Sequence, residues 1–164
     1  IYIVETDYWK QPFASKRHWC FIHDCLRDLR KDLKNIGQSL IVRSGSVKKI
    51  FEELSCGYNI ISILSHEETG NQWTYDRDKS LQNWSLLKNI SFTEFPSNGI
   101  VRRLKNRSEW SKIRHSRMTE KLVSTPTHII PITGSEEGVI PYNADTMFEH
   151  NNKGIIQNGG RRKA

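Results

Sequence analysis

With 164 residues the chain is long enough for one domain with a core of its own. Its three cysteines, Cys20, Cys25 and Cys56, have no Cys-x-x-Cys spacing and no clustered histidines, which predicts reduced thiols, no disulfide framework and no metal site. The net charge is +7, and the absence of a signal peptide and of a membrane-spanning apolar run predicts a soluble, cytoplasmic protein without a membrane partner, which we expect to be a monomer.

Short apolar strands alternate with amphipathic helices in the first part of the chain. The predicted strands cover 2–4, 39–43, 58–65 and 90–95, and the predicted helices cover 16–35, 47–54 and 75–88. Ser15 is the expected cap of the first helix, and residues 5–13 are an expected loop. Strand–helix alternation with short connections predicts an α/β fold with a parallel sheet covered by helices on both faces. Because the chain opens directly on a strand, we expect an earlier strand to precede it.

Periodicity also predicts the buried sides of two helices. In the first long helix, apolar residues that include Leu26, Leu29 and Leu33 recur at three- and four-residue steps. In the helix over 75–88, Leu81, Trp84 and either Leu87 or the stem of Lys88 are expected to be buried.

The regular pattern ends after Pro96. A helix over 108–118, capped by Ser108, is expected, and residues 119–158 then carry several Pro, Gly and Asn. Such a long irregular segment is typical of an interdomain linker. We therefore predict a domain over 1–118 and a linker over 119–164.

Most of the excess positive charge lies between Arg102 and Arg117, where seven basic residues face the single acid Glu109. A basic segment of this kind can neutralise nucleic-acid phosphates. We favour the alternative that it is a solvated helix face or the contact surface for an acidic partner domain.

The stretch "SHEETGNQWTYDRD", Ser65 to Asp78, leaves the third predicted strand at its carboxyl end, where parallel sheets place ligands. Glu67 and Glu68 could accept hydrogen bonds from a heteroaromatic ligand or from an adjoining helix. Trp73 and Tyr75 could stack on a planar ligand or pack into an interface. No Gly-x-Gly-x-x-Gly, phosphate loop or catalytic Ser or Cys set is visible, so we assign no catalytic residue.

Four stretches, in this order and spacing, resemble the cryptochrome and DNA photolyase family. They are "ASKRHWCFIHDCLRDLRKDLKNIGQSLIVRSG", "HEETGNQWTYDRD", "NGIVRRLKNRSEW" and "IIQNGGRRKA". The resemblance covers nearly the whole chain. It implies the family's N-terminal domain, a Rossmann-like, doubly wound parallel sheet of about five strands, followed by a linker to a helical FAD-binding domain outside this chain.

The resemblance also implies a function for the parent protein. That protein would be a deoxyribodipyrimidine photolyase, a lyase that uses light and FAD to split pyrimidine dimers in damaged DNA. This domain would hold, or once have held, a folate or deazaflavin antenna, and it would contact its own FAD-binding domain while being inactive alone. The alternatives are a cryptochrome blue-light receptor and a free-standing adenine-nucleotide-binding α/β domain.

The family's functional positions map onto three groups of residues. Glu67, Glu68, Asn71 and Trp73 would face the antenna cleft. Structural or interface roles fall to Arg77, Asp78, Asn98, Gly99 and Arg102, where Arg77 and Asp78 are expected to hold the loop through an internal or an interdomain salt bridge. Arg103 and Arg107 would contact DNA.

Overall fold

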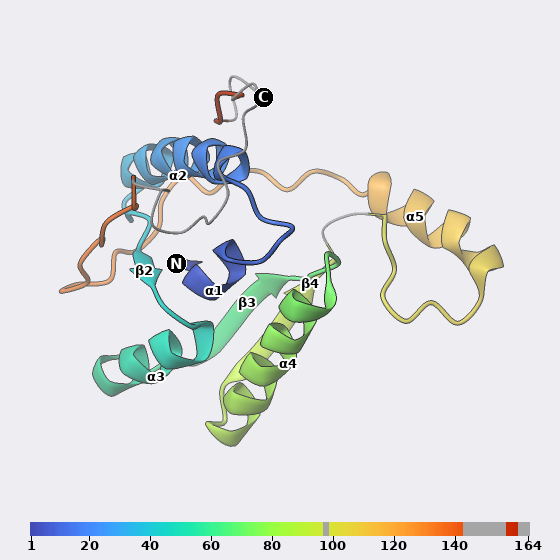
Figure 1. Ribbon diagram of the computed structural model, residues 1–164, viewed down its shortest axis with the longest axis horizontal. Coiled ribbons are helices and arrows are strands. Elements are labelled where there is room, and N and C mark those ends of the chain that lie inside the picture. Colours follow the sequence, from blue (N-terminus) through green and yellow to red (C-terminus); the bar gives the residue numbers. More distant parts are fainter. Residues whose placement is uncertain (97–98, 143–156, 161–164) are drawn as a thin grey trace. The chain divides into compact units, whose positions relative to one another are not determined.

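The computed structural model describes residues 1–96, 99–142 and 157–160, and it divides into two compact units (Figure 1). Unit 1 comprises Ile1–Ile50 and Thr125–Ala164, and unit 2 comprises Phe51–Ser124. Among the described residues, no helix is long and apolar enough to cross a membrane. The predicted boundary between a domain over 1–118 and a linker over 119–164 stays a prediction.

Unit 1 is built on a parallel strand pair. Strand β1 (Tyr2–Val4) pairs with β2 (Val42–Ser44), with Tyr2 opposite Val42 and Val4 opposite Ser44. Between them in sequence lie α1 (Thr6–Trp9) and α2 (Lys16–Asn35). The predicted cap is confirmed, because the Ser15 hydroxyl accepts a hydrogen bond from the His18 backbone N–H at 3.3 Å.

The core of unit 1 depends on α1, which lies in the segment expected to be a loop. This single turn places Trp9 against Trp19 of α2, with ring centroids 5.0 Å apart, in a buried cluster that also contains Val4, Leu26 and Val42. Four residues are too few to show a helical period, so the sequence pattern missed this turn. The predicted burial of Leu29 is wrong: its side chain is 45% exposed because it lies at the edge of the buried stripe of α2.

Residues 125–142, here called the return segment, contain no helix or strand and pack on unit 1. The Glu137 carbonyl accepts a hydrogen bond from the Val42 N–H at 2.7 Å, so the return segment occupies an edge position beside β2. Further along, the Pro141 carbonyl accepts a hydrogen bond from Trp19 Nε1 at 3.1 Å. The first part of the predicted linker is therefore part of the packed structure of unit 1.

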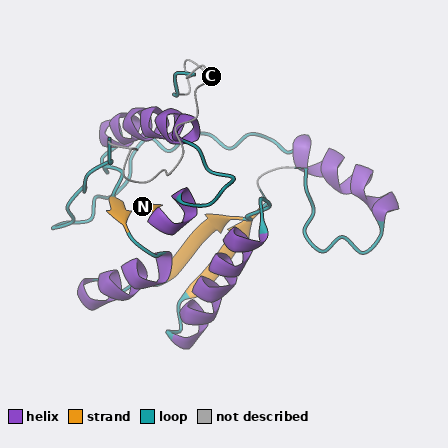
Figure 2. Ribbon diagram, viewed as in Figure 1, coloured by secondary structure: helices purple, strands orange, loops and turns teal. Residues whose placement is uncertain are grey.

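Unit 2 contains a second parallel strand pair. Helix α3 (Val47–Gly57) starts in unit 1 and ends in unit 2, where β3 (Ser62–His66) pairs with β4 (Ser91–Phe95) over five residues. Helix α4 (Gln72–Leu87) runs alongside this pair (Figure 2). Burial alternates along β3, with Ile63 buried and Leu64 66% exposed, so the expected cover on both faces is not seen among the described residues.

Two predictions about helices of unit 2 differ from the structure. Leu81 and Trp84 are buried as expected, but Leu87 is 83% exposed and Lys88 is exposed as well, because the end of α4 lies beyond its buried side. The helix predicted over 108–118 is a 3₁₀ turn, η1 (Arg107–Glu109), that leads into helix α5 (Trp110–Met118). The cap is Asn106 and not the predicted Ser108, because η1 begins at Arg107: Asn106 Oδ1 accepts a hydrogen bond from the Ser108 N–H at 3.0 Å.

The fold class is α/β with parallel strands, as predicted. The described strands form two separate two-stranded sheets, β1–β2 and β3–β4, in place of the predicted single sheet of about five strands. Both pairs are parallel, and helices lie between the paired strands in sequence: α1 and α2 between β1 and β2, and α4 between β3 and β4.

Candidate functional site

The loop after β3 ends in a well-capped helix. Asn71 is the N-cap of α4: its Oδ1 accepts from the Thr74 N–H at 3.1 Å, and the Thr74 hydroxyl reaches back to the Asn71 N–H at 3.4 Å. This reciprocal pair satisfies two backbone groups that a helix start would otherwise leave open. The helix consequently begins three residues earlier than predicted, and its first turns project Tyr75 and Asp78 from a fixed position.

Glu68 holds the loop itself together. Its Oε1 accepts from the backbone N–H groups of Thr69, at 3.0 Å, and Gly70, at 2.9 Å. Its Oε2 lies 3.7 Å from Arg77 Nη2, while Arg77 also donates to Asp78 Oδ1 at 2.8 and 2.9 Å. These two ion pairs of Arg77, with Glu68 and Asp78, therefore lie within the loop and the first turns of α4.

Arg102 joins the ends of the two strands. Its Nη2 donates to Glu94 Oε2 of β4 at 2.7 Å, and its Nε lies 3.7 Å from Glu67 Oε1. Glu67 directly follows β3 and extends the ladder, since its N–H donates to the Phe95 carbonyl at 2.8 Å. The hydrogen bond with Glu94 raises the pKa of Arg102, so this guanidinium stays charged.

A cleft of about 190 Å³ lies at this end of β3 and β4, between the strands and α4. Its lining residues are Glu67, Tyr75, Asp78, Lys79, Gln82, Glu94, Arg102 and Arg103. Two carboxylate oxygens, Glu67 Oε2 and Glu94 Oε1, are buried and have no hydrogen-bond partner among the described residues. Buried acceptors of this kind are costly unless something donates to them, so the cleft is suited to a ligand with N–H or O–H donors.

A cationic cluster lies around Tyr75. Arg103 Nη2 donates to the Tyr75 hydroxyl at 2.7 Å, Lys79 Nζ lies 5.3 Å from the ring centroid, and the Arg102 guanidinium lies 6.0 Å from it. The hydrogen bond from Arg103 lowers the pKa of Tyr75, with smaller contributions from the other two cations. Arg103 has a positive φ of 56°, which non-glycine residues adopt at a cost.

Asp78 is the third carboxylate of the cleft. Burial raises its pKa, although the charge and hydrogen bond of Arg77 act in the opposite direction. The cleft therefore combines hydrogen-bond acceptors and cations within a single small volume.

The structure brings only part of the predicted residue set together. Glu67 lines the cleft, whereas Glu68 and Asn71 make contacts within the loop, and half-buried Trp73 is not a lining residue. Arg107 is exposed on η1 and is not a lining residue. The antenna role of Glu67, Glu68, Asn71 and Trp73 and the DNA role of Arg103 and Arg107 stay predictions.

Among the residues that were predicted to have structural or interface roles, Arg102 lines the cleft, and Asn98 lies outside the described residues. Gly99 accepts a hydrogen bond from Trp110 Nε1 at 2.9 Å, and a Cβ there would lie 2.9 Å from Arg114 Cγ, so a larger residue would require the Arg114 side chain to shift. Glu94 was missed by sequence reasoning. Its position near the carboxyl end of the next strand is the signal that could have found it.

No group of three or more His, Cys, Asp and Glu side chains in the described part of the chain is arranged to hold a metal ion.

Fold and cleft together define a class of protein: an α/β domain with a polar cleft at the carboxyl ends of parallel strands, where such domains place ligands. Comparison with known protein families identifies the family to which this chain belongs. The family model described as DNA photolyase matches residues 1–112, more than half of the chain. The chain belongs to the DNA photolyase family.

A curated protein is similar to the chain in sequence, and a solved structure is similar to it in fold. A curated protein, cryptochrome DASH, chloroplastic/mitochondrial, of Arabidopsis thaliana, is 31% identical over 64 residues, which are 39% of this chain and 11% of that protein. The crystal structure of a bacterial class III photolyase from Agrobacterium tumefaciens superposes with a TM-score of 0.69 at 15% identity, covering 85% of this chain and 30% of that chain. The chain thus spans a minor part of each relative.

Proposed function

We propose that this chain is the N-terminal, antenna-binding part of a light-dependent DNA repair flavoprotein, a deoxyribodipyrimidine photolyase that splits pyrimidine dimers. FAD, damaged DNA and the FAD-binding domain would be the partners of the whole protein. In this proposal the two strand pairs belong to the doubly wound, five-stranded sheet of that family. The match over residues 1–112 supports this function over a free-standing adenine-nucleotide-binding domain.

The observation that supports an antenna role is the pairing of two buried, unpartnered carboxylate oxygens with an adjacent group of cations. A folate carries amino and ring N–H donors at one end and carboxylates at the other, and a deazaflavin carries a ring N–H. Glu67 and Glu94 would accept from the ring donors, while Arg103 and Lys79 would attract the anionic end. When bound, such an antenna absorbs light and passes the excitation to the flavin.

This proposal changes the set of residues that the sequence predicted to contact the antenna. Glu67 is retained and Glu94 is added, because both have an oxygen that is buried without a partner. Glu68 and Asn71 already have backbone partners that account for their residue types. We therefore place them in the framework of the site, as residues that fix the loop and the start of α4.

The antenna assignment is tested with two carboxamide variants of the full-length protein. Glu67→Gln should weaken folate or deazaflavin binding about tenfold or more, since it removes a charge-assisted hydrogen bond. Glu68→Gln keeps an acceptor for the Thr69 and Gly70 N–H groups and should bind normally. Binding is followed by the ligand's absorbance after equilibrium dialysis. Equal loss in both variants, or loss only in Glu68→Gln, would contradict this assignment.

The repair function is tested separately on the full-length protein, purified in the dark. We expect flavin absorption bands and, under blue light, restoration of thymine absorbance in an oligonucleotide that contains a pyrimidine dimer. Absence of flavin would refute both the repair function and the receptor alternative.

The second candidate is a cryptochrome blue-light receptor, which the similarity to cryptochrome DASH favours. It predicts flavin bands and a light-induced change of the flavin spectrum without repair of the dimer. The same experiment therefore separates the two functions.

A further inference from the structure

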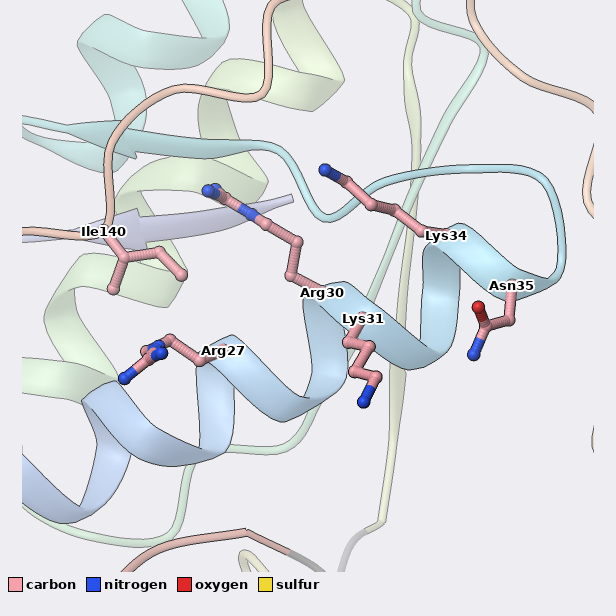
Figure 3. A pocket seen from close by; sticks show the side chains of 6 residues that line it. All are labelled: Arg27, Arg30, Lys31, Lys34, Asn35 and Ile140. Atoms are coloured by element: carbon pink, nitrogen blue, oxygen red, sulfur yellow. The ribbon is translucent and has the colours of Figure 1, made fainter.

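The second surface of interest lies on α2 in unit 1 and involves none of the residues of the cleft. Arg27 lies three and four residues before Arg30 and Lys31, and these lie four and three residues before Lys34, which places the four residues on one face of the helix. With Asn35 and Ile140 they line a shallow hollow of about 390 Å³. Figure 3 shows the four basic side chains on successive turns of α2, with Ile140 on the segment beside the helix.

Two of these four residues are anchored by the return segment. Lys34 Nζ lies 2.7 Å from Glu137 Oε1, and this hydrogen bond lowers the pKa of Glu137, so the carboxylate is charged at neutral pH. Arg30 donates to the carbonyl oxygens of Leu40 and Glu137, both at 3.1 Å. Carbonyl groups fix the guanidinium in place but do not neutralise its charge.

The other two residues, Arg27 and Lys31, are exposed and have no ion pair among the described residues. Glu137 is thus the one carboxylate that forms an ion pair with this face in the described part of the chain, against four positive charges. Like charges at (i, i+3) and (i, i+4) destabilise a helix by a few tenths of a kcal/mol per pair. The acids of α2 form a neighbouring row, in which Asp24 and Asp28 lie three residues before Arg27 and Lys31, but no ion pair joins them to these cations in the described part of the chain. An external anion would relieve the remaining repulsion among the four cations.

The shape of the hollow indicates which anion it fits. The hollow is open, whereas sites for small molecules are concave and enclose most of the ligand. From Arg27 to Lys34 the helix rises about 10 Å, which matches roughly three nucleotides of one strand of duplex DNA. We propose that the basic face of α2 binds the phosphate backbone of nucleic acid, without reading its sequence.

The test measures how binding of undamaged duplex DNA depends on salt, so it requires neither repair activity nor an antenna. In the full-length protein, Arg27→Gln with Lys31→Gln removes two phosphate contacts while leaving the anchored Arg30 and Lys34 in place. Glutamine is a good helix former, so α2 should persist. The slope of log Kobs against log salt should fall in magnitude by about 1.8, and binding near 0.1 M salt should weaken roughly 10- to 100-fold.

Two controls make this result specific. Lys48→Gln with Lys49→Gln removes the same charge from exposed positions of α3 and should change the slope by less than half as much. Arg27→Lys with Lys31→Arg keeps both charges and should retain the wild-type slope. An unchanged slope in the Arg27→Gln, Lys31→Gln variant would overturn the proposal and favour an acidic protein partner for this face. An equal change in the α3 variant would overturn it as well, because net charge would then explain the effect.

Discussion

Single side chains explain why the loop after β3 has its composition. Asn71 and Thr74 form a reciprocal cap, and Glu68 accepts from two backbone N–H groups, so three of its polar residues stabilise the loop and the helix start. A loop that is fixed in this way holds the neighbouring cleft residues in position without a ligand. Pre-organisation of that kind lowers the entropic cost of binding.

Removal of the cap should reduce stability in a measurable way. We expect Asn71→Ala to lower the free energy of unfolding by about 1 kcal/mol, because the Thr74 N–H loses its acceptor. Asn71→Asp should retain most of the stability, since aspartate caps equally well. Urea unfolding followed by tryptophan fluorescence measures both. A variant Asn71→Ala as stable as wild type would show that the cap contributes nothing.

Asp78 should give the stability of the protein a pH dependence of defined sign. Its folded-state pKa is raised by burial above the ordinary value of 3.8, so between 3.8 and the raised pKa the folded state keeps a proton that the unfolded state has released. The contribution of Asp78 to stability should therefore decrease as pH rises through this interval. The measurement is the unfolding free energy of wild type minus that of Asp78→Asn, which should fall as pH rises across that range. A value that rises with pH would contradict the predicted sign.

At the scale of elements, the return segment forms a backbone hydrogen bond with the edge of β2, as a further strand would do. Glu137 accepts the Val42 N–H, and Ile129 donates to the Ile36 carbonyl at 2.6 Å, so an irregular segment satisfies backbone groups at the edge of the strand and the end of α2. Gly138 allows this close approach: its φ is +71°, and a Cβ there would clash with the Val42 carbonyl oxygen.

Two glycines of the return segment form a matched test of that contact. Gly134 and Gly138 have similar φ values, +74° and +71°, but a Cβ on Gly134 would meet nothing within 4 Å. Gly134→Ala should cost about 1 kcal/mol for its backbone conformation alone. Gly138→Ala should cost at least about 1 kcal/mol more, because the added methyl group must displace the segment from β2. Equal thermal stability of the two variants would show that the contact with β2 is unimportant.

At the scale of the whole molecule, the charge of +7 is distributed over distinct surfaces. The segment from Arg102 to Arg117 contributes many of the cations, but their partners differ. Arg102 forms an ion pair with Glu94, whereas Arg103 donates to the Tyr75 hydroxyl and Arg117 to the Ile100 carbonyl, neutral groups that do not themselves cancel a charge. Arg107 is exposed on η1. The number of basic residues in a stretch of sequence therefore does not by itself identify which of these cations are available to a polyanion.

Charge reversal distinguishes the two hypotheses for this segment. If Arg103 and Arg107 meet phosphates, Arg103→Glu with Arg107→Glu should flatten the salt dependence of DNA binding by the full-length protein, by about 0.9 in slope for each lost contact. If the segment instead contacts the FAD-binding domain, the slope should stay unchanged while thermal stability of the full-length protein decreases. The measurements are DNA-binding titrations at several salt concentrations and a thermal melt.

The sequence by itself determined the class of fold, the positions of the long helices and the family, because these depend on periodicity, caps and the order of motifs along the chain. The Ser15 cap and the strand at Tyr2–Val4 follow from local chemistry and are seen as expected. The tertiary structure decided what depends on contacts between distant residues. It placed Glu94 beside Glu67 and Arg102, it gave Glu68 and Asn71 backbone partners, and it laid the return segment along β2 and α2. Burial and pairing across the chain produce these features, and no local pattern encodes them.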